Sequence, residues 1–347
     1  MIFVKKARLS FAPGLDIEFV DRDRAIQQVL KFAEKGTRFP IVVFGPEGCG
    51  KTAWLKQSIE ILKNIEFDVI YFNPMRREFF AEVGIESIRE KALEIANQMS
   101  SEYILAKSIW SVIKFARDVI KLGRKSIAVI VDDAFHLIGS KEASLFIKGL
   151  LELIEYPPEN YERIVAIAAT SEGASKNEIG RHLWAILRPM WNMSKRGFEE
   201  LYDKVPGSKP RFEDVWLSTS GNPRALSLLY QVEWNINIAV DNLAKMKGIR
   251  KFIASLSNEE KEWLSEAIED PDTLLTKEHI PLLDKLVELN LVIDNIEGCY
   301  MLGVVSIFLF YFLCIAVCKE PRGHLNKVAF ILILVIIVID SNFSKAI

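Results

Sequence analysis

The chain has 347 residues, with 44 Lys or Arg against 46 Asp or Glu, and its formal net charge is -2 at pH 7. This length leaves room for two or three domains, and the near-neutral charge gives no overall bias toward nucleic acid. The four cysteines have neither zinc-site nor disulfide-framework spacing, which fits a reducing, cytoplasmic environment. The apolar run at residues 1–4 is too short for a secretory signal.

In chain order, the first segment with a clear pattern is Phe19-Val20-Asp21-Arg22. It leads into charged and apolar residues that predict an N-capped helix. Residues 40–44 then form a short apolar, β-branched run, which is typical of a buried parallel strand. This strand ends where the strongest motif of the sequence begins.

That motif matches the Walker A pattern G-x-x-x-x-G-K-[ST] at every fixed position. It consists of Gly45, Pro46, Glu47, Gly48, Cys49, Gly50, Lys51 and Thr52. Its glycines would let backbone N–H groups point at phosphate oxygens, Lys51 would reach the β- and γ-phosphates, and the Thr52 hydroxyl would bind Mg²⁺. Helix formers continue through Ala53, so the phosphates would lie at a helix N-terminus. ATP is favoured over GTP because no N-K-x-D string occurs.

Further runs predict more of the same sheet. Apolar strand patterns occur at residues 68–72, 126–133 and 163–171. Helical patterns separate them at residues 86–98, 104–122 and 141–154. Strands that alternate with helices indicate an α/β fold with a parallel sheet covered on both faces.

Polar residues end two of these strands. Asp132 and Asp133 lie at the carboxyl end of a buried run, where ligands of open parallel sheets bind. As in a Walker B motif, Asp132 would hold Mg²⁺ through its water shell, and Asp133 would orient or deprotonate the attacking water. The alternative is two acids that begin a solvated loop. Thr170 could sense the γ-phosphate, or its hydroxyl could cap the next loop.

Further along the chain, Gly221-Asn222-Pro223 opens a helix, and its proline is preorganised for the first turn. This motif could bring backbone or Arg224 near the nucleotide. Arg181 and Arg188 are candidates for a charge-stabilising arginine, although a surface role is the simpler interpretation of each.

Four landmarks in this order make the sequence resemble the archaeal ATPase family, part of the STAND branch of P-loop ATPases related to AAA+. They are the segment beginning at Phe19, the phosphate loop, the Asp132-Asp133 strand end and Gly221-Asn222-Pro223. Residues 191–201 also resemble that family's transition from the last strand into a small helical lid. The resemblance covers residues 15–302. It implies an ASCE-type sheet, with Phe19 and Val20 flanking the adenine and Pro223 contacting the nucleotide from the lid.

One departure concerns the catalytic acid. The family usually has Asp-Glu where this chain has Asp132-Asp133. Aspartate is one methylene shorter, so its reach to the water falls by about 1.5 Å, and a misplacement of about 1 Å can cost about 100-fold in rate. With Lys51, Asp133 and Thr170 as the catalytic residues, we therefore predict slow hydrolysis, as in a timed switch.

The region after residue 250 has the pattern of a winged helix. A capping box at Ser257 opens a first helix, and Pro281 can start a second. The apolar side of the first is predicted to contain Trp263, Leu264, Ala267 and Ile268, and that of the second Leu282, Leu283, Leu286 and Leu289. Residues 291–302 would form the wing hairpin.

The charge of this region argues against DNA. Residues 250–300 hold five Lys or Arg against twelve Asp or Glu, whereas DNA binding typically uses about six to ten phosphate contacts. We expect the module to pack on the ATPase core or to bind a protein partner. A basic cluster is the one counter-signal, formed by Lys245, Lys247, Arg250 and Lys251.

The end of the chain is apolar. Residues 298–318 carry no charge and are long enough for a membrane span, which needs about 20 apolar residues. The second apolar run, residues 328–339, is shorter, and the flanking charges invert the positive-inside rule. Three interpretations stay open: a membrane anchor, a tail translated in a shifted frame, and burial in an oligomer interface.

Four regions are therefore expected. They are an ATPase core (1–192), a helical lid (193–248), a winged-helix-like domain (249–302) and an apolar tail (303–347). The predicted function is an ATP-binding, slowly hydrolysing switch whose lid and winged helix move relative to the core. The alternatives are a non-hydrolysing nucleotide-binding interaction protein at a membrane and a DNA-associated AAA+-like ATPase.

Overall fold

The computed structural model describes residues 5–98, 102–171, 173–289 and 291–292. The chain divides into two compact units, Met1–Glu200 and Leu201–Ile347. The predicted span at 298–318 and most of the predicted wing lie outside the described residues. Within the described ranges, no helix combines the length and the apolar character that a bilayer crossing requires.

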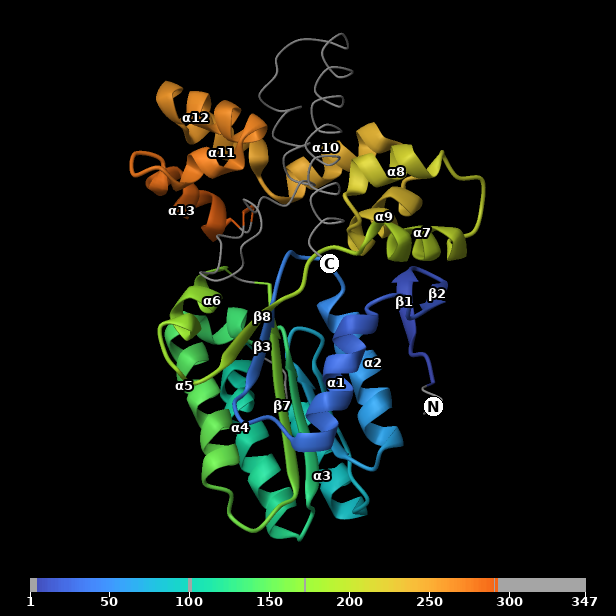
Figure 1. Ribbon diagram of the computed structural model, residues 1–347, viewed down its shortest axis with the longest axis vertical. Helices are drawn as coiled ribbons and strands as arrows, with labels where there is room; N and C mark the ends of the chain where they lie inside the picture. Colours follow the sequence, from blue (N-terminus) through green and yellow to red (C-terminus); the bar gives the residue numbers. More distant parts are fainter. Residues whose placement is uncertain (1–4, 99–101, 172, 290, 293–347) are drawn as a thin grey trace. The chain divides into compact units, whose positions relative to one another are not determined.

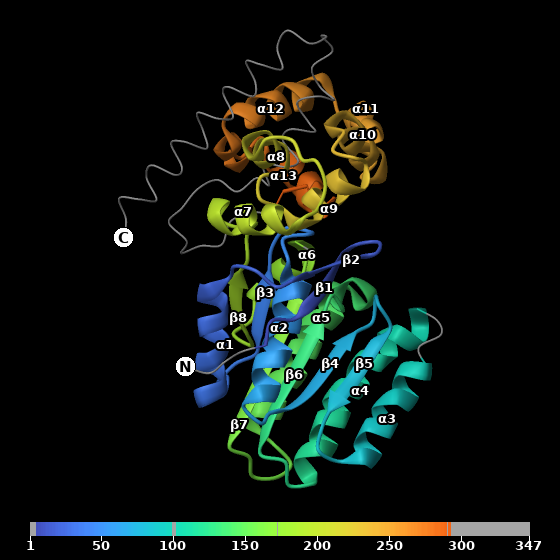
Figure 2. The same ribbon diagram turned by 90° about the vertical axis from the view of Figure 1, so that its right-hand side faces the viewer.

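The first unit, drawn in Figure 1, is built on a six-stranded sheet with the order β5-β4-β6-β7-β3-β8; Figure 2 labels each of these strands. Its strands are β3 (Ile41–Phe44), β4 (Asp68–Asn73), β5 (Glu78–Glu82), β6 (Ser126–Asp132), β7 (Arg163–Thr170) and β8 (Ile186–Pro189). All neighbours pair in parallel except β5, which pairs antiparallel with β4. The predicted α/β fold with a parallel central sheet is confirmed.

Helices cover both faces of this sheet, as Figure 2 shows from the side. One layer contains α1 (Asp23–Lys35) and α2 (Lys51–Asn64), and the other contains α3 (Glu86–Gln98), α4 (Glu102–Lys121) and α5 (Phe135–Glu155). Each layer encloses its own buried apolar cluster. A short helix, α6 (Gly173–Gly180), connects β7 to β8.

Alternation along β6 decides which side chains face which layer. Ala128 and Ile130 belong to the cluster under α1 and α2, whereas Val129 and Val131 belong to the cluster under the other layer. Because successive side chains of a strand point to opposite faces, Asp132 continues the first series. Its carboxylate is thereby directed toward α2, the helix that follows the phosphate loop.

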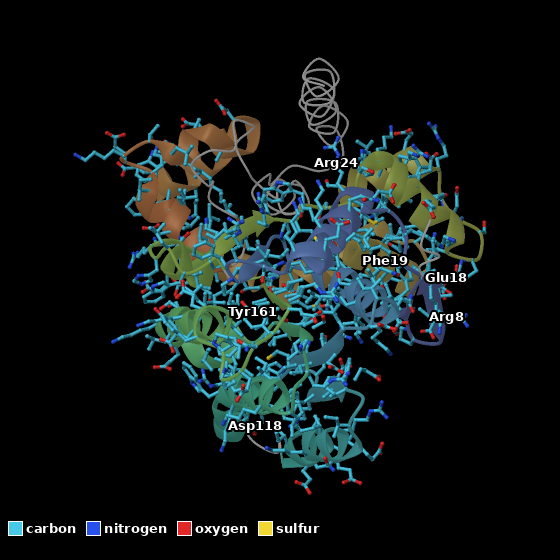
Figure 3. The ribbon with its side chains drawn as sticks, turned by 60° about the horizontal axis from the view of Figure 1, so that its bottom comes forward. Arg8, Glu18, Phe19, Arg24, Asp118 and Tyr161 are labelled. Carbon is cyan, nitrogen blue, oxygen red and sulfur yellow. The ribbon has the colours of Figure 1, made fainter. Side chains whose placement is uncertain are left out.

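A small hairpin precedes the sheet and anchors the segment that leads to Phe19. Its strands are β1 (Arg8–Ala12) and β2 (Leu15–Glu18), in which Arg8 and Glu18 are register partners and lie side by side in Figure 3. The Phe19 N–H donates to the Ala7 carbonyl at 2.9 Å. The Ala7 N–H in turn donates to Gln57 Oε1 of α2 at 2.8 Å. Sequence analysis did not predict this hairpin.

The second unit is helical. After α7 (Lys195–Lys204), which crosses into it, come α8 (Phe212–Thr219), α9 (Pro223–Gln231), α10 (Ile236–Met246), α11 (Ile249–Ser255), α12 (Asn258–Glu269), the short 3₁₀ helix η1 (Pro271–Leu275) and α13 (Ile280–Glu288). An apolar cluster is shared by α10 to α13. The capping box predicted at Ser257 is present, because Ser257 and Glu260 each accept a hydrogen bond from the other's backbone N–H.

The second predicted helix of this region is α13, and Pro281 lies in its first turn. Leu282, Leu283 and Leu286 are buried as predicted, but Leu289 is 37% exposed. The helix ends at Glu288, so helical periodicity no longer applies to Leu289. The expectation that Leu289 joins the apolar side is wrong for this reason.

Candidate nucleotide-binding site

The phosphate loop follows β3 directly and ends where α2 begins at Lys51. Gly48 and Gly50 have φ angles of 81° and 101°, in the left-handed range that favours glycine. Gly50 is the N-cap of α2 and supplies no side-chain cap to the helix. The first N–H groups of α2 are therefore the kind of donors that hold phosphate at a helix N-terminus.

Gly45 is required for a different reason. A Cβ built on this residue would lie 1.9 Å from the carbonyl oxygen of Met190, which follows β8. Any side chain at position 45 would clash with this oxygen, and the clash could be relieved only by moving backbone. The first glycine of the motif thus allows the loop to lie against the residue after β8.

Gly45→Ala is expected to lower the free energy of unfolding by about 2–3 kcal/mol, because the new methyl group must displace backbone. Gly180→Ala is the matched control, since its Cβ would meet only the flexible Leu187 Cδ1, at 3.2 Å. Urea unfolding of both variants measures the difference. Equal losses in the two variants would contradict the steric explanation.

Lys51 lies inside the loop and is only 8% exposed. Its Nζ donates to the carbonyl oxygens of Gly45 and Pro46 at 2.8 and 2.9 Å. The ammonium group is therefore held by the same backbone that the motif arranges around phosphate. This position fits the predicted contact with the β- and γ-phosphates.

Asp132 is 2% exposed, and its interaction with the Thr52 side chain lowers the pKa of its carboxyl, against the larger effect of burial. The two predicted metal ligands are therefore adjacent, one from the strand end and one from the first turn of α2. Burial raises the pKa of Asp132 above its ordinary value, and the hydrogen bonds that the carboxylate accepts partly oppose this shift. The carboxylate is strongly desolvated in the protein without a cation.

Two residues of β4, missed by sequence analysis, hold the other side of this carboxylate. The Tyr71 hydroxyl and the Asn73 Nδ2 each donate to Asp132 Oδ2 at 3.0 Å. Burial raises the pKa of Tyr71, so its hydroxyl keeps the proton that it donates. The available signal was their spacing, because residues at i and i+2 of a strand share one face, and here both are polar near the end of a largely apolar strand.

Asp133 lies just after β6 with a φ of 53°. Its N–H donates to the Ala169 carbonyl of β7 at 3.1 Å, and its Oδ1 accepts a hydrogen bond from Ser171 Oγ at 3.2 Å. Thr170 is the last residue of β7, is 2% exposed and is the register partner of Phe44. Strand β7 thus brings Thr170 and Ser171 between the phosphate-loop strand and the strand that carries the acids.

The other predicted site residues are distributed as follows. Phe19 and Val20 are both 7% exposed, and Phe19 belongs to the apolar cluster under α1 and α2. Glu47 is exposed and Ala53 half-buried, in the loop and the first turn of α2. Pro223 is the first residue of α9 in the second unit, where the Asn222 side chain caps the helix. Its contact with a nucleotide stays a prediction.

The donor set near the loop fits Mg²⁺. A hydroxyl and a carboxylate are oxygen ligands, and Mg²⁺ is usually held by one or two carboxylates together with water and substrate phosphates. Across the described ranges, no cluster of three or more His, Cys, Asp or Glu side chains forms a metal cage. Thr52 and Asp132 therefore suit a cation that arrives with its nucleotide.

Comparisons with known proteins give one family match and several similar solved structures. The model of a family described as an ATPase domain predominantly from Archaea matches residues 19–229. No curated protein matches the chain. Among solved structures, the chain is similar to the ORC2 protein of Aeropyrum pernix in its ADPNP–ADP complexes, with 12% identity, 85% of this chain and 93% of that chain covered, and a TM-score of 0.47.

Two further structures are similar at a lower TM-score of 0.37. The similarity to CDC6P from Pyrobaculum aerophilum, at 14% identity, covers 90% of this chain and 98% of that chain. The replication initiator DnaA, bound to AMPPCP and single-stranded DNA, has 17% identity and covers 78% of this chain and 74% of its own. The family match itself extends over most of the chain, from the segment before α1 to α9. The chain therefore belongs to the archaeal ATPase family of P-loop proteins.

Proposed function

We propose that this protein is a Mg²⁺-dependent ATPase that hydrolyses ATP slowly and acts as a nucleotide-dependent switch. The observation that supports it best is the position of Lys51, whose buried Nζ is held by the Gly45 and Pro46 carbonyls of the phosphate loop. Thr52 and the buried Asp132 at the end of β6 occupy the positions that hold the cation in P-loop ATPases. The strand order, with β7 between β3 and β6, also supports an ASCE-type sheet.

Each residue then has a definite part in the reaction. Loop N–H groups and Lys51 would hold the phosphates. Thr52 and Asp132 would hold Mg²⁺, which would supply positive charge beside the transferred phosphoryl group. Asp133 orients the attacking water, and Thr170 senses the γ-phosphate. Phe19 and Val20 flank the adenine, with Pro223 contacting the nucleotide from the second unit.

Calorimetric titration with ATP, in the presence and absence of Mg²⁺, tests this function. We expect a heat of association that strengthens with Mg²⁺ and exceeds that of GTP, followed by slow release of phosphate under single-turnover conditions. Correctly folded protein that gives no heat with ATP and Mg²⁺ would refute the proposal. Binding without any phosphate release would leave only a nucleotide-holding interaction protein.

Slow hydrolysis depends on the short side chain of Asp133. Asp133→Glu is expected to raise turnover by about 10-fold to 100-fold, because the longer carboxylate reaches the water more closely. Asp133→Asn is the control and should lower turnover below that of the parent. Turnover is measured by phosphate release at saturating ATP. No gain from the glutamate would contradict the explanation of slow hydrolysis.

We infer a protein partner for the second unit rather than DNA. The acidic balance of residues 250–300 supports this inference. Moreover, Lys285 is engaged within the unit, because its Nζ lies 2.6 Å from Glu260 Oε1. Salt-sensitive binding of duplex DNA, lost when Lys245 and Arg250 are neutralised, would contradict it. Membrane flotation of the native protein tests the predicted anchor at 298–318. The measured mass of the native protein tests for an oligomer.

A further inference from the structure

The turn before α1 has an unusual backbone. Asp21 and Arg22 are consecutive and both left-handed, with φ angles of 59° and 70°. Neither is glycine, and side chains with a Cβ disfavour this region. The sequence predicts an ordinary N-capped helix here, yet the N-cap position is Arg22 itself and no side chain caps the helix. Contacts elsewhere must hold the turn in this conformation.

The Arg22 guanidinium makes these contacts. Its Nη2 donates to the Cys49 carbonyl of the phosphate loop at 2.5 Å and to the Trp191 carbonyl at 2.7 Å. Its Nη1 lies 3.5 Å from the Asn192 carbonyl. Trp191 and Asn192 belong to residues 190–197, here called the exit segment, which leads from β8 into α7. One side chain therefore joins the phosphate loop to the exit segment.

Two further contacts fix the exit segment at its ends. At the start, the Met190 carbonyl lies against Gly45, as described above, and accepts from Cys49 Sγ at 3.3 Å. At the other end, a Cβ on Gly197 would lie 2.1 Å from Asp21 Oδ2. The exit segment thus contacts the loop on one side and the left-handed turn on the other.

The bond to Cys49 has a consequence for phosphate binding. In a trans peptide unit the C=O and the following N–H point in opposite directions. When Arg22 holds the Cys49 oxygen, the N–H of Gly50 is directed the opposite way. The Gly50 N–H is one of the backbone donors that the motif offers to the phosphates.

We propose that Arg22 is a positioning residue that orients the Cys49–Gly50 peptide for phosphate and ties the loop to the exit segment. ATP binding in the loop is thereby transmitted to residues 191–197 and the start of α7. This inference rests on the proposed function, because it gives the switch its first mechanical step. It assigns no contact between Arg22 and ATP.

Hydrogen exchange of backbone amides tests the proposal first without nucleotide. In Arg22→Gln and in Arg22→Lys, which keeps the charge but loses the planar fork, exchange is expected to rise together at residues 49–51 and 191–197. Arg24→Gln is the matched control, because Arg24 is exposed and lies two residues further on; Figure 3 labels it. Exchange that rises only within α1 would overturn the proposal.

The second measurement adds ATP and Mg²⁺. In the parent, ATP should slow exchange in both segments. In the Arg22 variants, ATP affinity should fall by about tenfold, the loss expected for one charge-assisted hydrogen bond. At saturating ATP the loop should still become protected in these variants while the exit segment does not. Parent-like protection of the exit segment would overturn the proposal.

These two measurements separate the inference from the proposed function. If the parent shows no response to ATP, the proposed ATPase function is refuted. If residues 49–51 and 191–197 nevertheless loosen together in the Arg22 variants, the role of Arg22 in tying these two segments together is supported. Gly197→Ala disturbs the same contacts from the side of the exit segment, because its methyl group would displace the Asp21 side chain. It should loosen residues 49–51 as well, even if an Arg22 variant does not fold.

Discussion

Lys51→Ala is expected to bind ATP at least about 30-fold more weakly than the parent in the presence of Mg²⁺. The ammonium group is held within the loop by two backbone carbonyls, where it would pair with the phosphates of bound ATP. Removing one partner of a buried charge pair costs about 2–5 kcal/mol. A free-energy loss of this size corresponds to a factor of about 30 to several thousand in affinity. Calorimetric titration of both proteins measures it.

Lys56→Ala is the matched control for this prediction. Lys56 lies on the same helix, and its Nζ is 3.6 Å from Glu78 Oε2 at a part-exposed site. Its removal takes away the same charge at a site away from the loop, so ATP affinity should stay within about twofold. Equal losses of affinity for the two variants would show that ATP is attracted by the overall charge of α2 and not by Lys51 in the phosphate loop. Thermal unfolding of each variant verifies that it is folded.

Asp132→Asn is expected to have two opposite effects. Mg²⁺ should strengthen ATP binding much less than in the parent, because the neutral amide oxygen holds a divalent cation more weakly than a carboxylate does. The protein without ligand should become more stable by about 1–2 kcal/mol, as is common when a strained active-site group is neutralised. The amide oxygen can still accept from Tyr71 and Asn73, so the gain arises from removing a desolvated charge.

The pH dependence gives the sign of the second effect. The folded pKa of Asp132 is raised above the unfolded value of about 3.9, so the folded state binds more protons in the range between them. Stability of the parent therefore falls as the pH rises through that range. The stability difference between variant and parent should grow over the same range in urea unfolding without nucleotide or Mg²⁺. A parent that is the more stable protein at neutral pH would contradict this.

Much of the sheet could be predicted because parallel strands buried on both faces are continuous apolar runs. Residues 126–131 contain no polar side chain after Ser126, and β6 extends over them and ends one residue later, at Asp132. The antiparallel edge strand β5 has the sequence EFFAE, whose two glutamates give too weak a pattern to separate it from a loop. The hairpin of β1 and β2 was missed although Pro13-Gly14 between its strands is a turn signal.

The site shows a similar division. Residues within a motif, such as Lys51 and Asp132, are predictable because a fixed spacing places them on known elements. Tyr71 and Asn73 act through a strand that is far from Asp132 in the sequence, and only the pairing of β4 with β6 brings them together. Arg22 was recognised as part of a family landmark, but its role depends on carbonyl groups, and these exist in every residue. No sequence pattern can single them out.

The pairing of β3 has a consequence for folding during synthesis of the protein. Ile41 pairs with Ile167 and Ile186, so both neighbours of the phosphate-loop strand come from the far end of the first unit. Contacts so distant along the chain form late and slowly, since a long loop must close first. A nascent chain that has emerged from the ribosome only as far as β7 still lacks β8 and the Met190 carbonyl. The ability to take up a nucleotide is therefore acquired only near the end of the synthesis of this unit.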